Sequence, residues 1–250
     1  MKSLFCLIAV LTMLTTSVSA EDTRLFELRT YHANPGKLDA LQARFRDHTV
    51  KLFEKHGMTN IGYWVPKDNK DNLLIYVLAF PDEDARSESW KAFGNDPEWK
   101  AVYAESTKDG RLVGKVDSVL LHVTDYSPEI KSVTEPPARL FELRTYTTNE
   151  GKLDTLNSRF RDHTVKLFEK HGLTNVAYWT PVEEEDGRDN KLIYLLAHRD
   201  EESRNAGFKA FGEDPEWQAA RKASEENGRI LIEGGVQSVF LEPTDYSPMK

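Results

Sequence analysis

An internal repeat constrains the fold of this chain more than any other feature of its sequence. Residues 24–31, Arg-Leu-Phe-Glu-Leu-Arg-Thr-Tyr, recur without change as residues 139–146, at an offset of 115 positions. The same offset holds as far as Pro66 and Pro181, and two small insertions account for its later increase. Similarity that extends over about 100 residues in each copy, a common size for a domain, predicts two homologous domains in tandem.

The first twenty residues are typical of a secretory signal. Lys2 precedes an apolar run from Leu4 to Leu14, and the segment ends in Val-Ser-Ala at Ala20. The apolar run is shorter than the roughly 20 residues that span a bilayer. We therefore expect cleavage after Ala20, export to the periplasm or the extracellular space, and no transmembrane segment in the mature chain. Cys6 is the one cysteine and leaves with the signal, so we expect no thiol chemistry.

The rest of the chain divides at a polar linker. We expect a first domain over residues 21–128, a linker with two consecutive prolines over residues 129–138, and a second domain over residues 139–250.

The composition, with 39% hydrophobic and 30% charged residues, is that of a soluble globular protein. The net charge is −8 and the sequence contains no basic stripe, so we expect no nucleic-acid partner.

Hydrophobic periodicity and turn residues predict the same order of elements in each copy. Residues 24–31 alternate as a strand does, and Asn34-Pro35-Gly36 is typical of a helix start. The first helix is expected to end at Gly57, and Asp96-Pro97 to begin a later one. The remaining strands are predicted over residues 60–65, 73–80 and 111–123. This order, β-α-β-β-α-β, is that of the α+β ferredoxin-like domain.

The ferredoxin-like order places both helices on one face of a four-stranded sheet, which leaves the other face uncovered. We expect Phe26 and Leu28 to face the helices, and Glu27, Arg29 and Tyr31 to lie on the uncovered face. Apolar and aromatic surface of this extent requires a partner. The second copy can supply it, so the sequence predicts two tandem domains that pair within one chain as a pseudo-dimeric α/β barrel.

Several short motifs resemble the NIPSNAP family. In the first copy they are Glu27–Tyr31, Pro35–Leu38, His48-Thr49, Lys55–Met58, Gly62–Trp64 and Asp96–Trp99, and the second copy keeps them in the same order with few exchanges. The resemblance implies a dimeric α/β-barrel fold, which agrees with the predicted order of strands. The wider superfamily that it implies includes small monooxygenases, lactone isomerases and haem proteins. The family itself brings no agreed reaction and no agreed catalytic residues.

His48 and His163 are the first candidate site residues. His48 follows Phe45 and precedes Leu52 at spacings of three and four, which predicts that it faces the sheet. The same periodicity places Arg44 on the opposite side of the helix. Imidazole titrates near neutral pH and can act as an acid, a base, or a metal or haem ligand. The alternative interpretation is a core histidine bonded to a backbone carbonyl.

A cation and a phenol lie two residues apart on the first strand of each copy. These are Arg29 with Tyr31 in the first copy and Arg144 with Tyr146 in the second. A guanidinium and a hydroxyl on one face are suited to a carboxylate or enolate ligand. The alternative interpretation is an internal Glu–Arg ion pair across the interface between the two sheets, formed with Glu27 and Glu142, because charges are seldom buried without a partner.

Trp64 and Trp179 complete the set of candidate ligand-binding residues. Each follows a tyrosine on the predicted second strand, where alternation allows only one ring of the pair to face a pocket. The sequence contains no nucleotide-binding glycine loop, no hydrolase signature and no pair of zinc ligands at helical spacing. It therefore indicates no cofactor and no preformed metal site, and it assigns no catalytic residue.

Two functional hypotheses follow from the sequence. The first is an exported NIPSNAP-type protein that binds a small organic molecule in a pocket between helix and sheet. The alternative is a cofactor-independent monooxygenase or isomerase, or a haem protein with His48 or His163 as the axial ligand. Whether the chain forms a homo-oligomer beyond the pairing of its two domains is left open.

Overall fold

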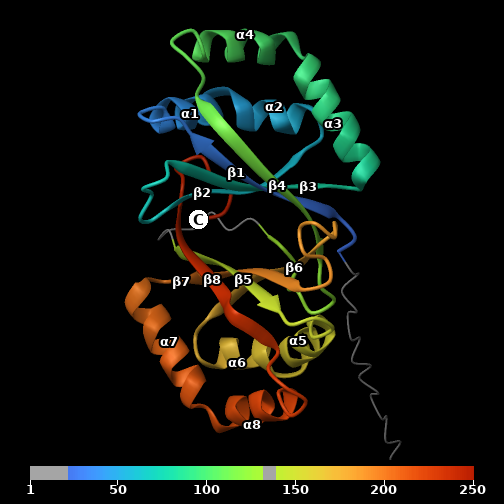
Figure 1. Ribbon diagram of the computed structural model, residues 1–250. Coiled ribbons are helices and arrows are strands. Elements are labelled where there is room, and N and C mark those ends of the chain that lie inside the picture. Colours follow the sequence, from blue (N-terminus) through green and yellow to red (C-terminus); the bar gives the residue numbers. More distant parts are fainter. Residues whose placement is uncertain (1–21, 132–138) are drawn as a thin grey trace, which may run out of the picture.

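The structure of the protein, a computed structural model, describes residues 22–131 and 139–250 (Figure 1). The signal segment predicted over residues 1–20 lies outside the described residues, and so do residues 132–138 of the predicted linker. Within the described residues, no helix is both long enough and apolar enough to cross a membrane.

Each repeat folds in the predicted order, with its second helical region divided into two helices. The first repeat comprises β1 (Leu25–Ala33), α1 (Leu38–Arg44), the π-helical turn η1 (Phe45–Thr49), α2 (Val50–Lys55), β2 (Thr59–Pro66), β3 (Leu73–Phe80), α3 (Glu83–Asn95), α4 (Pro97–Ser106) and β4 (Val113–Val123). The second repeat comprises β5 (Leu140–Thr148), α5 (Leu153–Arg159), the π-helical turn η2 (Phe160–Thr164), α6 (Val165–Lys170), β6 (Thr174–Pro181), β7 (Lys191–His198), α7 (Glu201–Glu213), α8 (Pro215–Ser224) and β8 (Leu231–Pro243).

The expected cap of the α3–α4 corner is confirmed, whereas the expected start of the first helix is not. Asp96 accepts a hydrogen bond from the N–H of Glu98 at 2.7 Å, directly before Pro97 in the first turn of α4. Residues 34–36 form a turn instead of a helix cap, and α1 begins at Leu38. The Asn34 side chain donates to the carbonyl of Arg111 at 2.8 Å, so it fastens the loop that precedes β4.

The eight strands close into one barrel in the order β1-β3-β2-β8-β5-β7-β6-β4. Each repeat contributes an antiparallel four-stranded sheet, and the two sheets join where β2 pairs with β8 and where β4 pairs with β6. Figure 1 shows α1 to α4 above the strands and α5 to α8 below them, so the helices cover the outside of the barrel. The predicted pseudo-dimeric α/β barrel is therefore confirmed.

Aromatic contacts between the repeats fill the barrel interior. The ring of Phe26 lies 5.9 Å from that of Trp179, and the ring of Trp64 lies 5.5 Å from that of Phe141. All four side chains are at most 1% exposed. The two tryptophans thus pack against strands of the opposite repeat, and burial of these rings contributes to the stability of the pairing.

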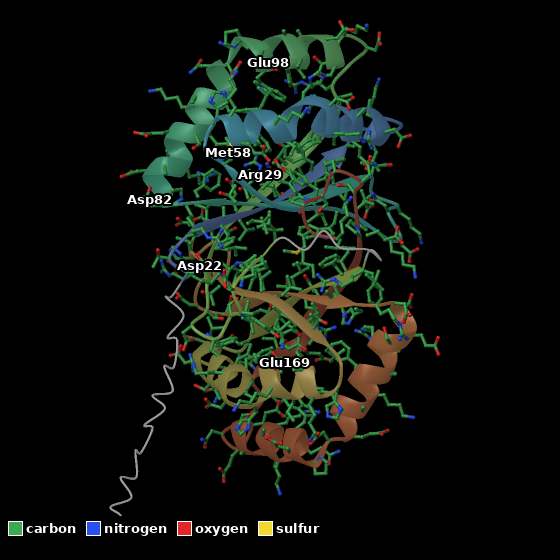
Figure 2. The ribbon with its side chains drawn as sticks, turned by 180° about the vertical axis from the view of Figure 1, so that it is seen from behind. Asp22, Arg29, Met58, Asp82, Glu98 and Glu169 are labelled. Atoms are coloured by element: carbon green, nitrogen blue, oxygen red, sulfur yellow. The ribbon has the colours of Figure 1, made fainter. Side chains whose placement is uncertain are left out.

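The two faces of β1 are the reverse of those that the sequence predicts. Phe26 and Leu28 point into the barrel, whereas Glu27 and Arg29 lie against α3 and Tyr31 packs in the helix–sheet layer. Figure 2 shows Arg29 beneath α1 and α2, on the side of the sheet that the helices cover. Alternation separates the two faces of a strand but does not say which face is which. The polar set faces α3 because that helix supplies hydrogen-bond donors, and the barrel interior is apolar.

The segment Thr-Asp-Tyr-Ser-Pro that follows the last strand of each repeat packs on the other repeat. Thr244 of the second repeat donates its backbone N–H to the carbonyl of Tyr63 in the first repeat at 2.9 Å, and the ring of Tyr246 lies 5.5 Å from that of Tyr63. Thr124 and Tyr126 of the first repeat make the same contacts with Tyr178 of the second repeat. Each helix–sheet core is therefore completed by residues of the opposite repeat.

Candidate functional site

The first helical region of each repeat contains a π-helical turn that changes which side chains face the sheet. In η1 the N–H of Val50 donates to the carbonyl of Phe45, five residues back instead of four. The additional residue in the turn leaves His48 exposed and places Thr49, which is 1% exposed, in the inward position. The expectation that His48 faces the sheet is therefore wrong, because it assumed one uniform α-helical period.

His48 lies instead in an open surface groove of about 470 Å³ between α1 and α4. Ala40, Ala43 and Val102 provide apolar walls for this groove. His163 occupies the matching position in η2 and is half-buried. A ligand-binding role for the two histidines stays a prediction, and it now concerns the outer surface of the helices.

Glu27 is the centre of a buried polar cluster beneath α3. Its carboxylate is fully buried and accepts hydrogen bonds from Arg86 at 2.8 and 2.9 Å, from the Trp90 indole at 2.8 Å and from the Ser118 hydroxyl at 2.6 Å. Arg29 donates to the same carboxylate. Burial by itself would raise the pKa of Glu27, but the hydrogen bonds from Arg86 and the charge of Arg29 lower it to about 2.

The second repeat contains the same cluster around Glu142. This carboxylate accepts hydrogen bonds from Arg204 at 2.9 and 2.7 Å and from Ser238 at 2.5 Å, and it is paired with Arg144. Arg144 also donates to the hydroxyl of Tyr146 at 3.2 Å. The structure thus has internal Glu–Arg pairs, as in the alternative interpretation of these arginines, but each pair lies within one strand beneath the helices and not across the interface between the sheets. Their contribution to ligand binding stays a prediction.

A pocket of about 250 Å³ lies in the first repeat between the first helix, α4 and the start of β4. Aromatic rings form much of its wall, and Tyr31 is the predicted site residue that reaches it. The lining residues are Tyr31, Arg44, Phe45, Thr49, Phe53, Phe93, Trp99, Tyr103, Arg111, Val113, Gly114, Lys115 and Val116. This pocket between helix and sheet is the best candidate site in the described part of the chain.

Arg44 is the buried cation of this pocket. The residue is 6% exposed, its Nη1 donates to the hydroxyl of Ser106 at 3.3 Å, and its guanidinium lies 5.3 Å from the ring of Trp99 and 5.6 Å from that of Tyr103. Its Nε has no hydrogen-bond partner among the described residues, and no carboxylate there forms an ion pair with the guanidinium. Burial lowers the pKa of Arg44, yet arginine keeps its charge at neutral pH. The pocket therefore contains a buried positive charge without a counter-charge.

The mouth of the pocket adds further positive charge. Arg111 and Lys115 are both exposed there, and Lys115 forms an ion pair with Asp117 at 2.8 Å. Within residues 22–131 and 139–250, no acidic side chain lines the pocket itself. An anion that approaches this opening thus meets two exposed cations before it reaches the buried one.

The residues of the pocket do not fit a haem group. Neither His48 nor His163, the expected axial ligands, is among them, and no histidine or cysteine of the described residues lines the cavity. Its volume also lies below the range of about 300–1,000 Å³ that is usual for drug-sized ligands, and a haem macrocycle is larger still. Trp64 and Trp179, packed inside the barrel, do not line the cavity either.

Sequence reasoning missed Arg44 and the residues around it. A uniform helical period placed Arg44 in solvent, and the π-helical turn that follows it gives no signal in a single sequence. The position of Trp99 over the guanidinium of Arg44 depends on how α4 packs against α1. The one available signal was a comparison between the repeats, where Tyr103 and Thr107 correspond to Arg221 and Glu225.

Comparisons with known proteins agree on family and fold. A sequence model described as NIPSNAP matches residues 26–128 and 141–248. A protein described as a NipSnap homolog from Dictyostelium discoideum is 25% identical over 141 residues, which cover 56% of this chain and 56% of that protein. A candidate monooxygenase from Fusobacterium nucleatum aligns over 88% of this chain and 92% of its own, with 11% identity and a TM-score of 0.55. One from Lactobacillus acidophilus aligns over 89% and 94%, with 9% identity and a TM-score of 0.53.

Proposed function

The chain belongs to the NIPSNAP family, and we propose that its first repeat binds a small organic anion in the pocket around Arg44. The observation that carries this proposal is the buried guanidinium, which forms an ion pair with no carboxylate in the described part of the chain. A buried charge is destabilising unless it is paired. A ligand that brings a carboxylate would supply the missing partner.

The walls of the pocket indicate what the rest of the ligand resembles. Phe45, Phe93 and Trp99 offer apolar and aromatic surface, and Tyr31 contributes a phenol that can donate one hydrogen bond. Arginine binds carboxylates through two parallel hydrogen bonds, which fixes the orientation of the anion. We infer a ligand with one carboxylate and a small apolar or aromatic body.

Turnover of such a ligand is the alternative proposal. It is supported only by the fold that the chain shares with the two candidate monooxygenases, and a shared fold does not by itself transfer a reaction. Export is proposed as well, on the signal pattern of residues 1–20, so the ligand would be met outside the cytoplasm.

Calorimetric titration of the mature protein, residues 21–250, tests the binding proposal. Benzoate and phenylacetate serve as anionic probes, and benzamide is the neutral probe of similar shape. We expect binding of the anions to exceed binding of the amide at least tenfold, because only the anions neutralise Arg44.

Two matched variants assign the binding to the pocket. The change Arg44→Gln should abolish the preference for anions, while Arg159→Gln removes the arginine at the equivalent position of the second repeat and should leave binding unchanged. Equal affinity for benzamide and benzoate, or anion binding that survives Arg44→Gln, would overturn the proposal.

A further inference from the structure

Arg44 and Arg159 occupy matching sites in the two repeats. Each is the last residue of the first helix, and they are 6% and 5% exposed. Each donates Nη1 to a serine at the end of the last helix of its repeat, at 3.3 and 3.2 Å. Each lies over the tryptophan of the Asp-Pro-Glu-Trp motif, at 5.3 and 5.1 Å, and each has an unpartnered Nε among the described residues. The repeats therefore place the same buried cation in the same setting.

The counter-charge is what differs between the two sites. In the second repeat an oxygen of the Glu225 carboxylate lies 3.5 Å from Nη1 of Arg159. Arg221 contacts the same carboxylate at 3.4 Å, so Glu225 lies between two cations. In the first repeat Thr107 stands at the position of Glu225, directly after the last helix, and Tyr103 stands at the position of Arg221.

The mouth of the second site has also lost a cation. Val116 pairs with Tyr31 on β1, and Val236 pairs with Tyr146 on β5, so these two valines correspond. The residue before Val116 is Lys115, whereas the residue before Val236 is a glycine. The second repeat thus keeps an arginine, Arg229, at the position of Arg111 but has no counterpart of Lys115.

From this difference we infer that Glu225 is a built-in substitute for the ligand, so that the chain binds one organic anion, in the first repeat, and not two. The inference rests on the proposed function and refines it. The Glu225 carboxylate takes in the second repeat the position beside the buried guanidinium that the carboxylate of the ligand takes in the first. The ligand class is therefore a monocarboxylate whose charged group pairs with the guanidinium of Arg44.

The stoichiometry of benzoate binding to the mature protein tests this inference. We expect the unchanged protein to bind one benzoate. The variant Thr107→Glu introduces the missing carboxylate beside Arg44 and should weaken benzoate binding at least tenfold, while Thr107→Gln, of similar size but neutral, should retain it. The variant Glu225→Thr removes the substitute in the second repeat and should raise the stoichiometry to two.

A combined variant relocates the site. In Thr107→Glu/Glu225→Thr we expect one benzoate to bind, and we expect that binding to be abolished by Arg159→Gln, which has no effect in the unchanged protein. This reversal is not explained by a general change in stability. If Thr107→Glu does not fold, the stoichiometry of Glu225→Thr decides the question alone.

The failure of the inference differs from the failure of the proposed function. Absence of anion-selective binding in the unchanged protein refutes both. Three results would refute the role of Glu225 and leave the first site in place, provided that binding depends on Arg44. These are a stoichiometry of two in the unchanged protein, binding that is unaffected by Thr107→Glu in a folded protein, and a stoichiometry that stays at one in Glu225→Thr.

Discussion

The Nε2 atom of His198 lies within hydrogen-bond distance of Oε2 of Glu142, at 3.2 Å. In the first repeat, the equivalent carboxylate receives a hydrogen bond from a different element. In the first repeat the position of His198 is occupied by Phe80, and the indole of Trp90 supplies a hydrogen bond to the buried glutamate. In the second repeat Phe208 stands at the position of Trp90 and has no donor to offer. Both repeats thus keep an aromatic N–H on the carboxylate, from β7 in one and from α3 in the other.

This compensation predicts that the two positions are energetically coupled. Trp90→Phe alone should destabilise the protein by about 1–2 kcal/mol, because Glu27 loses a donor inside a buried cluster. Addition of Phe80→His should recover about 1 kcal/mol, since the imidazole can reach the carboxylate as His198 does in the second repeat. Urea unfolding of the two single variants and the double variant measures the coupling. A double variant that is no more stable than Trp90→Phe contradicts the compensation.

The carboxylate of Glu27 should contribute strongly to stability near neutral pH. Its pKa is lowered from 4.5 to about 2, a difference that corresponds to about 3 kcal/mol. Because the folded state favours the charged form, this contribution is complete above about pH 4.5 and is lost as the pH falls toward 2. Glu27→Gln should therefore unfold more easily at pH 7 and lose less stability on acidification than the unchanged protein.

An exposed glutamate provides the control for this measurement. Glu105 is 73% exposed and forms a surface ion pair with Lys108, so Glu105→Gln should change stability by less than about 0.5 kcal/mol. Unfolding is followed by circular dichroism between pH 2.5 and 7. Parallel stability curves for Glu27→Gln and the unchanged protein would show that Glu27 does not stabilise the fold through its charge.

The repeat, the order of the strands and the pairing of two sheets were predictable because they depend on period and length, which a sequence displays directly. The faces of β1 were not, since an alternating strand such as residues 24–31 is equally consistent with either orientation. The choice depends on Arg86 and Trp90, which are about 60 residues away in the chain and meet Glu27 only in the folded protein. The position of Arg44 depends on η1, and the hydrogen-bond pattern of that turn is not encoded by hydrophobic period.

The π-helical turn reverses the stability effects that the helical period predicts for His48 and Thr49. His48 is exposed, so His48→Phe should change the free energy of unfolding by less than about 0.5 kcal/mol. Thr49 is buried and donates its hydroxyl to the carbonyl of Arg44 at 3.1 Å, so Thr49→Val should cost about 1–2 kcal/mol. Thermal and urea unfolding of the two variants compares them directly. A larger loss for His48→Phe than for Thr49→Val would place the histidine in the core after all.

Export remains a prediction from the sequence, and one measurement tests it. When the full chain is expressed in a bacterium with a Sec pathway, the exported protein should have the intact mass of a chain that begins at Glu21. Replacement of Ala20 by a bulky residue, as in Ala20→Trp, should block that cleavage and leave the longer form in the membrane fraction. A soluble protein that retains Met1 and Cys6 would contradict the signal assignment.

We expect neither repeat to be stable as a monomer, because the other repeat supplies the strands that pair with both edges of its sheet and also part of its core. In residues 22–128 alone, β2 has lost its pairing with β8, and β4 its pairing with β6. In this fragment the apolar face that carries Phe26 and Trp64 would be exposed to water, and the space that Tyr246 fills beside Tyr63 would be empty.

The repeat carries its own copy of the exchanged segment, residues 124–128, so two copies can complete each other. We therefore expect residues 22–128 to form a homodimer with a closed barrel, measured as twice the monomer mass by light scattering. The variant Trp64→Ala should weaken that dimer, and a folded, stable monomer would refute the view that the repeats depend on one another.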